Sequence, residues 1–147
     1  MKVRTCIAAI GATALAGTGA FVLPALASAS STTHTLKFIS VTKNAVGFTK
    51  KTGGQQDTDV NAKGKTIGFD ELYFAATSKT TAFVNVTLDT TGGLLYATLT
   101  FHFNTGTSTN GKVTGGTGAF KGATGTITAK NLNKQGTRTA VTVKYHG

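Results

Sequence analysis

Few side chains in this sequence combine the type and the spacing that chemistry requires. Glu71 shares strand parity with Ile67, Phe69 and Tyr73, so in a regular strand it faces the same side as these apolar residues. A carboxylate in an apolar cavity has a raised pKa and can act as a general acid or base. The alternatives are that a bulge turns Glu71 outward or that it pairs with a lysine. Asp70 presents the same choice on the opposite face.

The other polar candidates do not suggest a catalytic or metal site. His34 and His146 lie near the two ends of the folded region and are too isolated for metal binding. His102 alternates with apolar residues, which favours solvent exposure or subunit contact. Asp57 and Asp59 lie in a polar segment without the additional oxygen ligands of a calcium loop. We therefore expect no bound metal and no cofactor.

Residues 1–29 have the composition of a secretory signal peptide. They begin with Lys2 and Arg4, continue with an uncharged and mostly apolar run, and end in small residues that fit cleavage. A retained membrane anchor is the alternative, but the glycines and the proline of the run weaken a spanning helix. We expect a secreted, extracellular protein made of one domain, residues 30–147, without a stable membrane anchor after cleavage.

The expected mature domain must fold without a disulfide, because Cys6 is the only cysteine of the chain. Loss of Lys2 and Arg4 lowers the formal net charge from +10 to +8, which still favours acidic partners. The cations are spread along the chain, as on a solvated surface rather than in a dedicated groove. We expect no specific nucleic-acid binding, and a basic module for anionic polymers is the third functional alternative.

Strand periodicity dominates residues 30–147, and helix periodicity is missing. Within residues 94–103, every second residue is apolar, and residues 81–88, 125–132 and 138–145 repeat the pattern. The loop after residue 88 predicts a hairpin.

Two further segments have simple expectations. Asn110-Gly111 predicts a tight turn between two strands. Residues 43–65 are polar and predict a long exposed loop with one short strand near residues 46–49. Apolar residues change phase in the strands near Phe38 and Asp70, which indicates a β-bulge or a strand that is apolar on both faces.

A glycine-rich segment follows residue 114. Glycine permits positive φ and close backbone approach, so this composition predicts a sharply bent corner that leads into a strand. Its five glycines are Gly115, Gly116, Gly118, Gly122 and Gly125. Together with the strand pattern, the corner predicts an all-β fold, a closed antiparallel barrel of about eight strands.

Two segments resemble a known family. Val113 to Ile127, reading VTGGTGAFKGATGTI, resembles the glycine-rich corner of the allene oxide cyclase barrel and dirigent-like family. Lys65 to Tyr73, reading KTIGFDELY, is similar to that family's second strand, and Thr35 to Phe38 more weakly to its first. The resemblance implies a calycin-like barrel with a small apolar cavity, commonly a homotrimer. The plant members cyclise an unsaturated fatty-acid epoxide or direct the coupling of phenolic radicals.

The catalytic residues of that family are not carried over. Its plant members place an acid on the first strand, where this chain reads Leu36-Lys37-Phe38-Ile39-Ser40, and the cyclases use a cysteine that residues 30–147 lack. Asp70 also stands one place later than the family's Gly-Asp pair.

The sequence therefore favours a non-catalytic barrel that binds a small apolar or phenolic ligand, or a structural module. The alternative is a cofactor-independent isomerase or cyclase, or a dirigent-type coupling guide, that acts by shaping its substrate in the cavity. The catalytic residues stay unassigned. The polar and aromatic candidates for the cavity lining are Phe69, Glu71, Tyr73, Phe101 and Tyr145.

Overall fold

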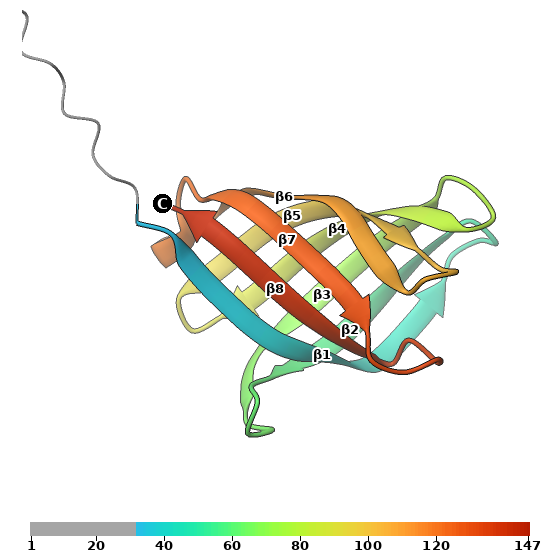
Figure 1. Ribbon diagram of the computed structural model, residues 1–147, viewed down its shortest axis with the longest axis horizontal. Helices are drawn as coiled ribbons and strands as arrows, with labels where there is room; N and C mark the ends of the chain where they lie inside the picture. Colours follow the sequence, from blue (N-terminus) through green and yellow to red (C-terminus); the bar gives the residue numbers. More distant parts are fainter. Residues whose placement is uncertain (1–31) are drawn as a thin grey trace, which may run out of the picture.

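The computed structural model describes residues 32–147, whose β-strands wrap into one closed barrel (Figure 1). The expected signal peptide, residues 1–29, lies outside the described residues. The strands are β1 (His34–Gly47), β2 (Thr52–Val60), β3 (Thr66–Ala76), β4 (Thr81–Thr90), β5 (Gly93–His102), β6 (Thr107–Gly116), β7 (Thr124–Asn131) and β8 (Arg138–His146).

The barrel is a meander in which each strand pairs with its neighbours in the sequence. Every pair is antiparallel, and β1 closes the barrel against β8, beside which it runs in Figure 1. This confirms the expected closed antiparallel barrel of eight strands. Closure leaves no strand of residues 32–147 with a free edge, which protects the sheet from pairing with other chains.

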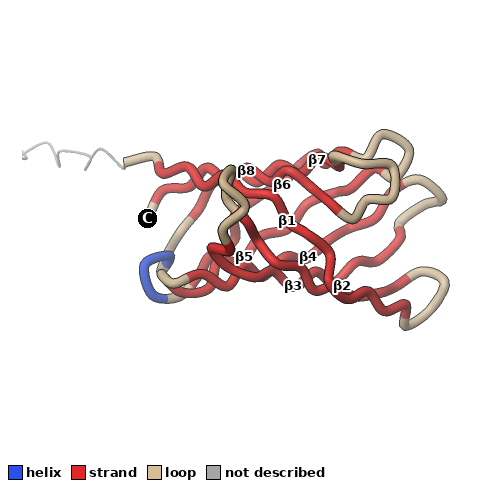
Figure 2. The backbone as a smooth tube through the Cα atoms, turned by 90° about the horizontal axis from the view of Figure 1, so that it is seen from below, coloured by secondary structure: helices blue, strands red, loops and turns tan. Residues whose placement is uncertain are grey.

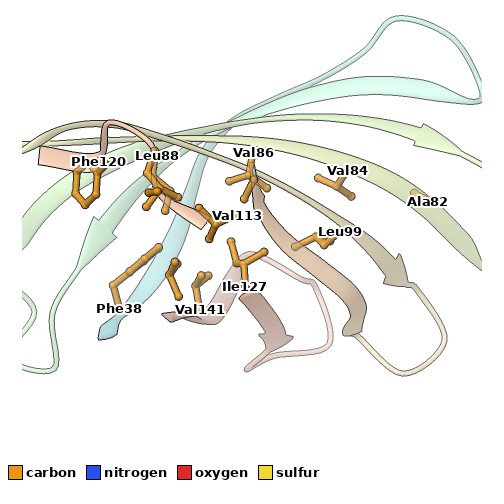
Figure 3. Packing of buried hydrophobic residues seen from close by; sticks show 14 residues of the cluster. Phe38, Ala82, Val84, Val86, Leu88, Leu99, Val113, Phe120, Ile127 and Val141 are labelled. Atoms are coloured by element: carbon orange, nitrogen blue, oxygen red, sulfur yellow. The ribbon is translucent and has the colours of Figure 1, made fainter. Parts of the chain in front are cut away.

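Alternate residues of each strand point into the barrel, as the period of two predicts. On β4 the inward residues are Ala82, Val84, Val86 and Leu88, which pair across the ladder with inward residues of β5. Figure 3 shows these β4 side chains across the barrel interior from Phe38, Ile127 and Val141, which belong to other strands of the same apolar core. The apolar interior thus comes from strands that are far apart in the sequence.

The glycine-rich corner closes one end of the barrel. It connects β6 to β7 through a 3-10 helix, η1 (Gly118–Phe120), which is the single helical element of residues 32–147 (Figure 2). Backbone hydrogen bonds from Thr117 to Leu94 and from Ala119 to Gly92, each of 2.8 Å, fasten the corner to the start of β5. Gly118 has a φ of 57°, and a side chain there would collide with the Gly92 carbonyl oxygen.

Phe120 fills this closed end from the corner. Its side chain is buried and meets Tyr145 of β8 edge to face, with ring centroids 5.4 Å apart. In Figure 3 it lies at one end of the core and Ala82 at the other. The Phe120 side chain of the corner therefore acts as a plug that fills this end of the barrel.

The expectation of a long exposed loop over residues 43–65 is wrong. Strand β1 continues to Gly47, and most of the remaining segment is strand β2. A register shift between Thr42 and Asn44 is a bulge in β1 that keeps the two strands paired beyond it. The polar composition predicted a loop because the inward face of β2 is itself polar.

The expected turn at Asn110-Gly111 is also wrong, because both residues lie inside β6. Asn110 has a φ of 54°. Thr109 and Lys112 of β6 are three residues apart, whereas their partners in β5, Thr100 and Thr98, are two residues apart, so β6 contains one extra residue. This is a β-bulge, which uses the same left-handed conformation as the predicted turn. No helix within residues 32–147 is long and apolar enough to span a membrane.

Candidate functional site

A cavity of about 380 Å³ occupies the barrel from its middle to the end opposite η1. Its walls are mainly aliphatic and aromatic side chains of β3, β4, β5 and β7. The connection between β7 and β8 contributes Lys134, Gln135 and Gly136 at the mouth. Such a volume suits a small organic molecule.

The inner part of the cavity is acidic. Three aspartates of β2 and β3 point inward, and each is almost completely buried: Asp57 and Asp70 are 3% exposed and Asp59 is 2% exposed. Asp57 and Asp70 are direct partners in the β2–β3 ladder and line the cavity. Asp59 pairs with Ser40 of β1, one inward position further from the mouth.

Hydrogen bonds from neighbouring side chains satisfy only part of this acidic cluster, Asp57, Asp59 and Asp70. The Ser40 hydroxyl donates to Asp57 Oδ2, and Gln55 Nε2 donates to the same oxygen over 2.8 Å. The Oδ1 atoms of all three aspartates are buried and receive no hydrogen bond from any residue between 32 and 147. Buried polar atoms without a partner are rare in native proteins, so the carboxylates of Asp57 and Asp70, which line the cavity, retain capacity to accept hydrogen bonds.

Asp59 holds its proton through neutral pH. Burial raises its pKa to about 8, because a charge is poorly solvated inside the barrel. The negative charge of Asp70, a hydrogen bond to Asp70 and the charge of Asp57 contribute smaller parts of this rise. At pH 7 Asp59 is therefore mainly a neutral donor.

Asp70 titrates closer to neutrality than an ordinary carboxyl group. Burial and the charge of Asp57 raise its pKa to about 6, while hydrogen bonds with Asp59 and Ser40 act in the opposite direction. Near neutral pH the cluster thus contains a protonated acid beside a carboxylate that can accept a proton. Such a pair can donate and accept protons, and it can also bind a polar group of a ligand.

Three of the residues predicted for the cavity lie on the outer surface instead. Phe69 is 55% exposed and Tyr73 is 46% exposed, and Glu71 between them is also exposed. Glu71 accepts a hydrogen bond of 3.1 Å from Gln56 Nε2 on the outside of β2. These three residues share one face of β3, as strand parity predicts, but the register of β3 makes that face the outer one. Asp70, on the opposite face, is the residue that enters the cavity.

The other predicted lining residues face inward. Phe101 of β5 lines the cavity near the mouth. Tyr145 packs against the core near the closed end, between Phe120 and a stacked His34, and lies away from the cavity. The five glycines of the corner lie at the closed end, so they have no place in the site.

Sequence reasoning missed the acidic cluster because it placed Asp57 and Asp59 in a loop. The spacing Gln55, Asp57, Asp59 has the period of two expected for one face of a strand, and this pattern was the available indication. The buried carboxylates of the barrel thus come from β2 and β3. Residues 32–147 hold no group of three His, Cys, Asp or Glu side chains arranged to bind a metal ion.

No protein-family model matches the chain, and no curated protein matches its sequence. Several solved structures have a similar fold. A pyocyanin demethylase has a TM-score of 0.62 and 15% identity over 76% of this chain and 99% of its own. An exo-specific intermolecular Diels-Alderase has a TM-score of 0.61 and 11% identity over 79% and 99%.

A pterocarpan synthase dirigent protein aligns with a TM-score of 0.56 and 15% identity over 78% of this chain and 83% of its own. At such low identity the likeness is one of fold. It supports the expected resemblance to dirigent barrels at that level and does not extend it to the allene oxide cyclases. The chain therefore shares its barrel fold with proteins of different activities.

Proposed function

We propose that this protein binds a small, mainly apolar molecule inside the barrel, with a polar group of the molecule held by the acidic cluster. The observation that supports this most is the cavity itself, whose apolar walls lead to Asp57 and Asp70. Ligand sites commonly combine such walls with a few convergent polar groups. The fold likeness to a dirigent protein and to two enzymes of small molecules agrees with this proposal.

The unpartnered oxygens of the acidic cluster favour the binding of a donor. A buried acceptor without a donor costs about 1–3 kcal/mol. A ligand whose polar group donates to the carboxylates of Asp57 and Asp70 offsets part of this cost, while its apolar body leaves water for the apolar walls. Binding is thus favoured by both ends of the molecule.

A matched pair of variants tests the site. Ala129 of β7 lines the cavity, whereas its neighbour Thr128 is exposed on the outer surface. We expect apolar amines, alcohols and phenols to raise the melting temperature of the wild-type domain and of Thr128→Phe. They should not stabilise Ala129→Phe, whose ring occupies the cavity. Equal stabilisation of both variants would place binding outside the barrel and contradict the proposal.

A second candidate function is proton-transfer catalysis, in an isomerase or cyclase. It is favoured by one pair of residues: Asp59 and Asp70 are both almost completely buried and close enough to hydrogen-bond to each other. Burial raises the pKa of Asp59 to about 8 and that of Asp70 to about 6, on either side of neutral pH. Two neighbours of the fold bear the names of enzymes, a demethylase and a Diels-Alderase. If the wild-type protein converts a bound ligand, and Asp59→Asn still binds this ligand but no longer converts it, the result supports catalysis. If the ligand binds and is not converted, the result supports the first function.

A further inference from the structure

The acidic cluster has an excess of negative groups over donors. Asp57 receives two hydrogen bonds, both at Oδ2, and Asp59 and Asp70 are close enough to bond to each other. One Oδ1 atom on each aspartate still lacks a partner among residues 32–147. Asp57 and Asp70 are more than nine-tenths buried, and both residues line the cavity.

No basic side chain of the described residues lies beside this cluster in the cavity wall. Lys134 is the one basic residue of the lining, and it belongs to the β7–β8 connection at the mouth. The side chains that surround the aspartates are instead a serine, a glutamine and aliphatic groups such as Leu88, the ladder partner of Asp70. Buried carboxylates are normally paired with a cation or protonated.

We propose that the cavity selects cationic ligands, namely an ammonium group on an apolar body, and that Asp57 and Asp70 hold the ammonium group. The inference rests on the proposed function and adds the chemical class of the ligand. An ammonium group has several N–H donors and no acceptor, which matches a cluster of acceptor oxygens. Charge-assisted hydrogen bonds of this kind are about twice as strong as neutral ones.

The apolar walls define the rest of the ligand. Val84 and Val86 of β4, Leu99 of β5 and Ile127 of β7 line the cavity together with Phe101. A volume of about 380 Å³ is at the small end of ligand pockets, so the body corresponds to one aromatic ring with a short chain or to a comparable aliphatic group. Such a ligand leaves no room for a second charged group.

Binding of a cation is coupled to proton release. The titratable groups that face this point are Asp57 and Asp59 from β2 and Asp70 from β3, and the inward partners on β1 and β4, Ser40 and Leu88, do not titrate. A nearby positive charge lowers the pKa of Asp59 from about 8, so at pH 7 a proton leaves when the ammonium group binds. Affinity for the amine therefore rises between pH 5 and pH 8, where the amine itself stays charged.

The experiment compares two ligands of the same shape, 4-phenylbutylamine and 4-phenylbutan-1-ol. Isothermal titration calorimetry is run at pH 7 in buffers with different ionisation enthalpies, which reports protons released on binding. We expect the amine to bind about tenfold more tightly than the alcohol, a difference typical of one charge-assisted contact, and to release a proton.

Asp70→Asn and Asp57→Asn test the assigned residues. Each is expected to reduce the preference for the amine and to leave binding of the alcohol nearly unchanged. Glu71→Gln is the matched control, because it removes a carboxylate from the outer surface of the same strand. It should keep both the preference and the proton release.

The outcomes separate this inference from the function on which it rests. If both ligands bind with equal affinity in the cavity, as judged by their loss in Ala129→Phe, the cation preference is wrong and the binding function stands. If Glu71→Gln removes the preference as fully as Asp70→Asn, the effect is one of surface charge and the assignment fails. If neither these probes nor any other small molecule binds, both proposals fail.

Discussion

Replacement of Asp70 by asparagine should make the protein more stable at alkaline pH. Asp70 is raised to a pKa of about 6 by burial and by the charge of Asp57, whereas the unfolded chain has the ordinary value of 3.8. Below pH 4 Asp70 is protonated in both the folded and the unfolded chain, so its titration does not change the free energy of unfolding. As the pH rises through this window, the unfolded chain releases its proton first, and the stability of the folded chain falls.

The structure sets the size of the effect. The window from 3.8 to about 6 spans roughly two pH units, and each unit corresponds to slightly more than 1 kcal/mol, so the loss is about 3 kcal/mol by pH 8. Asp70 is only 3% exposed, so solvent screens its interactions with the neighbouring charge very little. Asparagine does not titrate, and it also removes a charge that raises the pKa of Asp59. The variant should therefore gain about 3 kcal/mol relative to wild type between pH 4 and pH 8.

Urea unfolding at pH 4, 6 and 8 measures this gain directly. For a domain of this size, the gain corresponds to roughly 10 °C in melting temperature. The melting temperature of Asp70→Asn, measured relative to wild type, should therefore be roughly 10 °C higher at pH 8 than at pH 4. Glu71→Gln serves as the control because it removes a carboxylate from the exposed outer surface of the same strand. A pH-independent difference between Asp70→Asn and wild type would refute the assignment of Asp70 to a buried acidic cluster.

Further predictions concern the closed end of the barrel. Phe120→Ala should lower the free energy of unfolding by about 3–5 kcal/mol, because it empties the plug, whereas Phe69→Ala on the outer surface should cost less than about 1 kcal/mol in the same urea experiment. Gly116→Ala should be more destabilising than Gly122→Ala. At Gly116 the new Cβ would lie 2.5 Å from the Leu94 carbonyl oxygen, while at Gly122 it meets nothing within 4 Å and only the φ of 77° opposes it. Equal costs at the two glycines, measured by thermal unfolding, would contradict the packing described for the corner.

Strands with one apolar and one polar face could be predicted from the sequence. Strands β4, β5, β7 and β8 have clean alternation, and their inward residues are the ones expected. The glycine-rich corner was also predictable, because its composition permits few structures other than a bend. Closure of the barrel was predicted from this corner together with the strand pattern, and the family resemblance implied the same fold.

The acidic cluster could not be predicted in the same way, because periodicity shows which residues share a face but does not show which face is inside. In β3 both faces contain apolar residues, with Phe69 and Tyr73 on one and Leu72 and Phe74 on the other. Only the pairing with β2 and β4 decides between them, and it places Asp70 opposite Asp57 and Leu88 inside the barrel. In β2 the inward face is polar, so a hydrophobic pattern was missing altogether.

The most direct test of the account is the titration of the aspartate carboxyl groups. Carbon-13 NMR of protein labelled at the aspartate carboxyl carbons, followed from pH 3 to pH 9, resolves each group. We predict that the Asp59–Asp70 pair loses its protons in two steps, near pH 6 and near pH 8, and that both steps move to lower pH when 4-phenylbutylamine is bound. Titration of every aspartate near pH 4 would mean that these carboxylates are solvated, and would contradict a buried acidic cluster in the barrel.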